Sequence, residues 1–230
     1  QDGPRAQKAG YDFMIQGMTG IMEITGEPDG MPQKVGVAFA DVFTGLYGVI
    51  GIQAALAQRA RTGKGQHIDM ALFDCMLAAQ ANQNLNYLTT GKSPQRMGNA
   101  HTSIVPYQVF PVSDGHIVIA CGNNRQFHNL ARALKRDDWI TDPRFADNAA
   151  RLDHRAEAVG QITEVLSHWR KLDVLPVLER AGLPSGPINT IAEALEDPPQ
   201  PHRQMRTKPE GIPGLRTPVQ FSDAQPPLPP

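Results

Sequence analysis

Residues 36–56, GVAFADVFTGLYGVIGIQAAL, form a long apolar stretch in which Asp41 is the one charged side chain. The run after Asp41 predicts a helix over about 41–61, and this helix organises the first part of the chain. Asp41 has two interpretations. It can be the helix N-cap, accepting hydrogen bonds from free backbone N–H groups. It can also be a nucleophile, because the positive end of a helix favours a negative charge there. The spacing leaves both open, and they are compatible.

Glycines recur every third residue along this helix, at Gly45, Gly48 and Gly51. Each glycine inside a helix costs about 1 kcal/mol relative to alanine, so three of them indicate a compensating need. Close approach of a second helix or of a ligand would meet that need. We favour packing of a second helix.

Other segments carry recognisable secondary-structure patterns. Apolar residues at helical spacing predict a helix within 11–26, closed by Gly26. The alternation in QHIDMAL predicts a strand, and YQVF and HIVIAC, joined by PVSDG, predict a hairpin. The remaining predictions are helices at 73–91 and 124–134, a loop at 92–107, a mostly helical stretch from Trp139 to Pro184 interrupted by TDPRF, and an extended tail after it.

This order of elements predicts an α/β protein with a smaller α+β domain. We place a large-domain segment at 1–100, the small domain at 101–182, and a return segment with an extended tail at 183–230. The chain does not begin with Met, so we expect an internal piece of a longer product.

The composition narrows the class of protein. The chain has 230 residues, 40% apolar and 20% charged, with a formal net charge of −1. Nucleic-acid and anionic-membrane binding need a basic excess, so neither partner is expected. No charge-free apolar run reaches about 20 residues, so no membrane span is expected. Cys75 and Cys121 lack metal-ligand spacing, and we expect buried free thiols and no metal site.

Several segments together resemble the class III CoA-transferases, the CaiB/BaiF family, over about residues 9–205. These segments are AGYDFMIQGMTGIMEITGEPDG, KVGVAFADVFTGLYGVIGIQAAL, RTGKGQHIDMALFD, MGNAHTSIVPYQVFPVSDGHIVIACGNNRQF, DPRFADNAARLDHRAE and GLPSGPINTIAEALEDP. The resemblance implies a Rossmann-like large domain, of which the N-terminal portion is expected to be missing here, plus a small α+β domain. It also implies an interlocked homodimer, unless the missing part is a second subunit.

In this family the nucleophile is an Asp about thirty residues after a GYD-type motif. Asp41 stands thirty residues after Tyr11, so the resemblance implies that Asp41 is catalytic. Asp69, expected to face solvent from a strand, and Asp74, expected at a helix N-terminus, do not match. The implied reaction moves CoA from an acyl-CoA to a carboxylic acid through an aspartyl mixed anhydride and an aspartyl-CoA thioester. A CoA thioester is then a substrate, and no permanently bound cofactor is expected.

The resemblance also suggests substrate contacts. Gly98, Asn99 and His101 match a loop that covers the family's active site, although formyl-CoA transferase has a run of glycines where this chain has one. That departure argues against oxalate or formate as substrate. The alternative is a plain connection between domains. Lys8 is a candidate contact for CoA.

Tyr11 and Asp12 are candidates for shaping the substrate pocket, the alternative for Tyr11 being a buried side chain with a satisfied hydroxyl. The superfamily also contains α-methylacyl-CoA racemases, which have a His where Tyr11 stands. Racemisation needs a group that titrates near neutrality, and a phenol holds its proton there, so Tyr11 favours transfer. The alternatives are an acyl-CoA racemase or isomerase, and an incomplete subunit acting as a binding partner. The expected location is the cytoplasm, or the mitochondrial matrix in a eukaryote.

Overall fold

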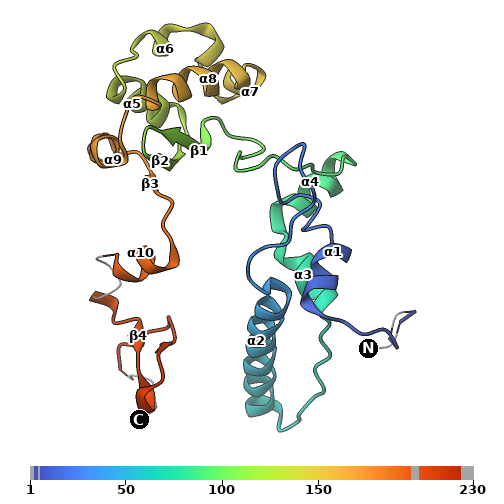
Figure 1. Ribbon diagram of the computed structural model, residues 1–230. Helices are drawn as coiled ribbons and strands as arrows, with labels where there is room; N and C mark the ends of the chain where they lie inside the picture. Colours follow the sequence, from blue (N-terminus) through green and yellow to red (C-terminus); the bar gives the residue numbers. More distant parts are fainter. Residues whose placement is uncertain (1–2, 5, 198–201, 224–230) are drawn as a thin grey trace. The chain divides into compact units, whose positions relative to one another are not determined.

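The computed structural model describes residues 3–4, 6–197 and 202–223 (Figure 1). The chain divides into two compact units, Gln1–Ser103 and Ile104–Pro230. The first unit contains α1 (Asp12–Met18), α2 (Phe39–Thr62), α3 (Leu72–Ala79) and α4 (Ala81–Thr90). The second contains β1 (Tyr107–Val112), β2 (Gly115–Ala120), α5 (Asn124–Ala133), α6 (Asp138–Thr141), η1 (Pro143–Phe145), α7 (Asn148–Asp153), α8 (Arg155–Leu166), α9 (Lys171–Arg180), β3 (Ser185–Pro187), α10 (Ile191–Glu196), β4 (Arg206–Thr207), η2 (Pro209–Gly211) and β5 (Gly214–Leu215).

Helices α1, α2 and α3 contact one another and form the body of the first unit. Its buried core is small and consists of Ile15, Ala40 and Met76, with Ile21, Phe39, Leu72 and Phe73 packed against it. Gln80 joins the ends of two helices, because its Nε2 donates to the Thr19 carbonyl at 2.8 Å. The described part of this unit is therefore a three-helix cluster, with α4 following α3.

Three predictions for this unit are wrong. The helix expected within 11–26 ends at Met18, since Gly20 adopts a φ of +89° and the chain turns. The segment 66–72 is no strand in the described structure, because a strand needs a hydrogen-bonded neighbour and none pairs with it there. The helix expected at 73–91 is interrupted at Ala81, whose φ of +38° separates α3 from α4.

The glycines of α2 serve a different neighbour from the one expected. A methyl group at Gly51 would lie 3.5 Å from Ile68 Cγ2, and one at Gly48 would lie 3.8 Å from Met70 Sδ. Both side chains belong to the segment that follows α2. Within the described residues, this segment and not a second helix contacts Gly48 and Gly51. Gly48, Ile52 and residues 67–70 line a shallow groove on this face.

Helix α2 is long and apolar, with 24 residues, a mean hydropathy of 1.4 over its most apolar window, and only 6% of that window buried. Within the described residues it alone has the length and composition to cross a membrane. One such helix is weak evidence, since helices of non-membrane proteins also reach these values. The expectation of no membrane span stays a prediction.

The second unit is assembled around the predicted hairpin, which is confirmed. Strands β1 and β2 pair antiparallel in a register that sets Val112 opposite Gly115, and β3 adds to the other edge of β2. Helices α5 to α9 gather around this small sheet in Figure 1. The core holds Phe110, Ile117, Phe127, Leu130, Trp139, Phe145, Ile162 and Leu166, among others. The helix expected at 124–134 is also confirmed, as α5, with Asn123 as its N-cap.

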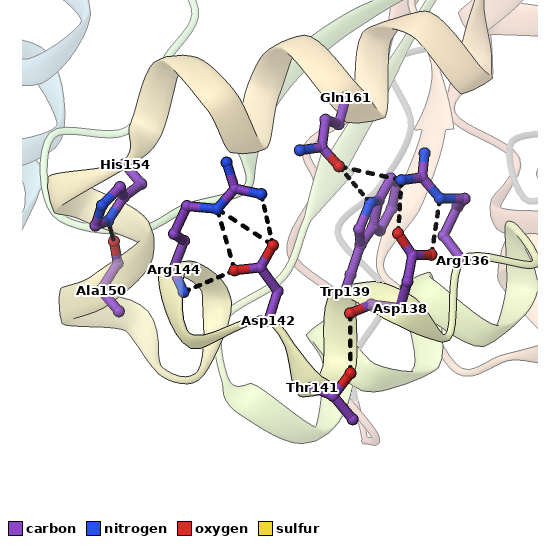
Figure 2. A network of polar contacts seen from close by, with 9 residues as sticks. All are labelled: Arg136, Asp138, Trp139, Thr141, Asp142, Arg144, Ala150, His154 and Gln161. Atoms are coloured by element: carbon purple, nitrogen blue, oxygen red, sulfur yellow. Dashed lines mark hydrogen bonds and ion pairs between the residues drawn. The ribbon is translucent and has the colours of Figure 1, made fainter.

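The DPRFADNAARLDHRAE segment supplies caps for short helices. Asp142 accepts from the Arg144 N–H and pairs with its guanidinium at 2.6 Å (Figure 2). Asp147 accepts from the Ala150 N–H at the start of α7. The hydrogen bonds from Arg144 lower the pKa of Asp142. Beside this, Trp139 Nε1 donates to Gln161 at 2.7 Å. The Trp139–Gln161 bond thus joins α6 to α8, while the two aspartates cap η1 and α7.

Arg151 is fully buried, and its guanidinium is satisfied by neutral acceptors. It donates to the carbonyls of Val105 and Phe145 at 2.7 and 2.9 Å and to Asn124 Oδ1 at 3.0 Å, and it lies 4.5 Å over the ring of Phe127. Burial lowers the pKa of Arg151. The side chain therefore ties the residues before β1 to η1 and α5.

The two cysteines are free and buried, as predicted. Burial raises the pKa of Cys121 to about 12, and the positive charge of nearby Arg151 opposes this only in part. A thiol with such a pKa is protonated at neutral pH and unreactive. Cys121 is thus a core residue of the second unit.

We expect Arg151→Leu to lower the free energy of unfolding by about 3 kcal/mol, because it leaves buried acceptors without a donor. Chemical denaturation measures this change. Arg132→Leu, at an exposed position on α5, is the matched control and should leave the midpoint unchanged. Equal midpoints for the two variants would contradict the structural role of Arg151.

Candidate active site

Asp41 lies in the first turn of α2, with an exposed side chain. The N-cap interpretation is wrong, because the helix begins at Phe39 and its N-cap is Ala38, which has no side-chain acceptor. Asp41 is the third residue of the helix. Its carboxylate is therefore near the positive end of the helix dipole while remaining open to solvent and to a reactant.

The capping role belongs to Asp12, a residue of another helix. Asp12 Oδ1 accepts the N–H of Ala40 at 2.8 Å, one residue before Asp41. Its second oxygen accepts from Gln16 Nε2 at 2.8 Å. Both oxygens of Asp12 are thus engaged, and Asp12 fixes the start of α2 where Asp41 stands.

Gln16 is fully buried and completes this arrangement. Its Oε1 accepts the N–H of Val35 at 2.9 Å, and its Nε2 also reaches the Val37 carbonyl at 3.3 Å. Helix α1 therefore holds the segment leading into α2 at residues 35–37 through Gln16 and at Ala40 through Asp12. The sequence reasoning missed Gln16. Its spacing of four residues from Asp12 on one helix was the available signal.

Tyr11 is the N-cap residue of α1, and its side chain is 71% exposed. The alternative of a buried tyrosine is wrong for the described structure. Lys8 is also exposed, in the turn before α1. Tyr11, Asp12 and Asp41 therefore lie at one end of the α1–α2 pair, since Asp12 bonds to the residue preceding Asp41.

The loop 97–101 is held by backbone bonds to the turn after α1. The N–H of Gly98 donates to the Gly26 carbonyl at 3.0 Å, and the N–H of Ala100 donates to Met97. Gly98 has a φ of +57°, and a methyl group there would lie 2.9 Å from Glu27 Oε2. Only glycine fits this position without displacing Glu27.

Asn99 and His101 differ in how they are held. Asn99 is exposed, and its N–H takes no part in the backbone bonds of the loop. His101 Nδ1 accepts the N–H of Ser103 at 3.0 Å. A neutral His101 ring then carries its proton on Nε2, which makes Nε2 a donor.

Two other acids occupy ordinary positions. Asp74 is an exposed acid in the first turn of α3, as predicted. Asp69 is exposed, but it lies outside any strand. Within the described residues, no group of three or more His, Cys, Asp or Glu side chains is arranged to hold a metal ion.

The chain matches a known family over its whole length. A family model described as CoA-transferase family III matches residues 1–230. Succinate–glutarate CoA-transferase of Agrobacterium fabrum is 48% identical and aligns with 96% of this chain and 57% of its own length. Human succinyl-CoA:glutarate CoA-transferase is 38% identical over 86% of this chain and 45% of its own length. This chain thus spans about half the length of these relatives.

Solved structures agree with the fold. A CaiB/BaiF family protein from Brucella suis superposes with a TM-score of 0.84 at 58% identity, covering 97% of this chain and 59% of that one. A Mycobacterium tuberculosis protein gives a TM-score of 0.85 at 23% identity over the same share of this chain and 59% of its own, which is a likeness of fold alone. The expected mixed helix-and-sheet class is confirmed, as part of a longer fold.

We expect Asp12→Ala to destabilise the start of α2 by about 1 kcal/mol, the usual cost of losing a helix cap. Amide hydrogen exchange should become faster in residues 39–42 and stay unchanged in β1 and β2. Asp12→Asn keeps an acceptor for the Ala40 N–H and should be affected less. Exchange in residues 39–42 that is as slow in Asp12→Ala as in wild type would refute the capping role.

Proposed function

The chain belongs to CoA-transferase family III, and we propose that its protein transfers coenzyme A from an acyl-CoA thioester to a carboxylic acid. Asp41 is the nucleophile of this proposal. The observation that carries it is an exposed carboxylate in the first turn of α2, at a helix start that Asp12 and Gln16 hold in place. The CoA thioester is a substrate, and the chemistry requires no permanently bound group.

The proposed reaction uses one carboxylate of the protein, that of Asp41, and the thiol of coenzyme A. An oxygen of Asp41 attacks the thioester carbonyl, and the C–S bond breaks to give a mixed anhydride and the CoA thiolate. The thiolate attacks the aspartyl carbonyl and expels the first acid as its carboxylate, leaving an aspartyl-CoA thioester. The acceptor carboxylate attacks this thioester, and its C–S bond breaks to give a second mixed anhydride and the CoA thiolate. The thiolate then attacks the acyl carbonyl of the acceptor, which forms the new acyl-CoA and releases the Asp41 carboxylate.

Each attack builds negative charge on a carbonyl oxygen, which hydrogen-bond donors must stabilise. The N–H groups of Gly98 and Ala100 are already bonded within the first unit. We assign the side chains of Asn99 and His101, which lie in the same loop, as polar contacts of the substrate. Gly98 lets the loop take this path, because its backbone conformation and the nearby Glu27 disfavour other residues.

The acids exchanged are proposed to be dicarboxylates. The relatives named above are succinate–glutarate and succinyl-CoA:glutarate CoA-transferases, and both names state pairs of dicarboxylic acids. Tyr11 and Asp12 would shape the end of the pocket where α1 meets α2. Lys8, a cation in the turn before α1, would contact a phosphate or the pantetheine of CoA. A racemase receives no support from this position, since a phenol is a weak acid and a poor base near neutral pH, whereas the racemases have a His there.

We also propose that the protein is a cytoplasmic homodimer, or a mitochondrial-matrix one in a eukaryote. The support is the apolar surface of the first unit. Seven large apolar side chains of α2 are exposed, and so are Leu85, Tyr87 and Leu88 of α4. The α2 residues are Val42, Leu46, Tyr47, Val49, Ile50, Ile52 and Leu56. Surfaces of this kind usually lie against other protein.

In the complete protein we expect Asp41→Asn to reduce CoA transfer between succinyl-CoA and glutarate by about a thousandfold or more, because the amide is no nucleophile. Hydroxylamine trapping after incubation with succinyl-CoA should place an adduct on Asp41, read by mass spectrometry. Asp74→Asn removes another exposed first-turn aspartate and is the control, with wild-type turnover. Full turnover in Asp41→Asn would overturn the mechanism. Exchange of the α-proton with deuterated water, without transfer, would point to a racemase.

The proposed homodimer can be tested by the mass of the protein in solution. Light scattering of the complete protein should give twice the polypeptide mass at micromolar concentration, because burying the α2 and α4 side chains favours association. Replacing Ile50 and Leu88 by Glu should weaken the assembly if these faces lie in the interface. A stable wild-type monomer would contradict the proposal.

A further inference from the structure

An ion pair joins the segment before the 97–101 loop to the turn that follows α1. Arg96 Nη1 lies 3.0 Å from Glu23 Oε1 and donates to the Glu23 carbonyl, also at 3.0 Å. The Arg96 side chain is only 16% exposed, although Glu23 is 62% exposed. The guanidinium is thus packed into the unit and binds both the side chain and the backbone of one residue.

The same turn holds the loop at a second point. The Gly98 N–H donates to Gly26, three residues after Glu23. Gly26 has a φ of +119°, and a methyl group there would lie 3.0 Å from the Met31 carbonyl and 3.4 Å from Arg96 Cδ. The aliphatic part of the Arg96 side chain therefore passes close to the backbone of Gly26. The 97–101 loop is fixed to residues 23–26 by two separate contacts.

Residues 23–26 follow α1, the helix that also holds the start of α2. Asp12, in the first turn of α1, binds the residue before Asp41, and Arg96 binds the turn beyond the other end of α1. One short helix with its following turn thus holds the carboxylate and the loop at the same time.

We propose that Arg96 is a positioning residue for the acid substrate. Through Glu23 and Gly26 it sets the 97–101 loop relative to Asp41, so that Asn99 and His101 meet the carboxylate that enters or leaves. This inference rests on the proposed CoA transfer. We assign Arg96 no contact with the substrate, since its Nη1 is bonded to Glu23 and its Nε is buried.

The test compares three variants in the complete protein. Arg96→Ala should raise the KM of the acid acceptor about tenfold, since small displacements of a positioning group cost that much or more. The KM of the acyl-CoA donor should change less than about twofold, because most donor contacts are with CoA. Glu23→Ala keeps the backbone carbonyl that accepts from Arg96, so it should raise the KM of the acid acceptor only about threefold. The double variant should match Arg96→Ala, because the two side chains act as one unit.

A second measurement does not depend on activity. Hydrogen exchange at the Gly98 amide should speed up in Arg96→Ala and stay near wild type in Arg96→Lys, which keeps a cation near Glu23. Arg206→Ala removes another Arg–Glu pair, to Glu196 at 2.6 Å, and serves as control in both measurements. Unchanged exchange and unchanged acceptor KM in Arg96→Ala would overturn the inference. If the wild-type protein showed no transfer activity and Arg96→Ala still sped up exchange at Gly98, the proposed function would be refuted. The contact by which Arg96 positions the loop would then still be supported.

Discussion

The hydrogen bond from the Ala40 N–H to Asp12 is the interaction on which the candidate site depends. Helix α2 begins at Phe39 after an alanine, so it has no capping side chain of its own. The acceptor comes from α1, twenty-eight residues earlier in the chain. A free N–H at a helix start is costly when it is shielded from water, and here a charged acceptor removes that cost. The position of Asp41 therefore depends on tertiary structure, because the contact with α1 fixes it. It would be lost if α1 separated from α2. The core that holds the two helices together is small, with Ile15, Ala40 and Met76 as its buried members. This makes the polar contacts of Asp12 and Gln16 a large part of what orients the helix start.

The two units bury their apolar residues to different extents. The second unit has a continuous core around β1 and β2, and the side chain of Arg151 is fully buried in this unit. The first unit leaves most of α2 open, with only 6% of its most apolar window buried. Exposed apolar area costs about 25 cal/mol per Å², so a stable protein covers such a face. The matched relatives are roughly twice as long as this chain, so in them there is further polypeptide that could lie on this helix. A second subunit and further polypeptide are thus the two kinds of protein surface that would cover this face.

Local patterns predicted the second unit well and the first unit poorly. The β1–β2 hairpin and α5 were predictable because alternation, a tight turn and an Asn N-cap lie within a few residues of each other. The segment 66–72 failed because a strand depends on a partner that no local pattern can supply. The N-cap assignment of Asp41 failed for a related reason. An aspartate before an apolar run looks like a cap, but Phe39 and Ala40 are already helical because Asp12 receives the N–H of Ala40. For the site, the resemblance to a family singled out Asp41, whereas Gln16, Glu23 and Arg96 became visible only through contacts that are distant in sequence.

The DPRFADNAARLDHRAE segment resembles the family but has structural roles and no part in the proposed chemistry. In DPRFADNAARLDHRAE the two aspartates cap η1 and α7, and Arg151 satisfies three buried acceptors. Such residues are hard to replace because each satisfies backbone groups that would otherwise be buried without partners. The resemblance of this segment to the family therefore bears on the fold of the second unit and says little about the reaction. The proposed reaction depends instead on a short stretch of the first unit, where one exposed carboxylate is set in place by a neighbouring helix. A protein could keep the whole second unit and lose its activity through the α1–α2 contact alone, since that contact decides where Asp41 points.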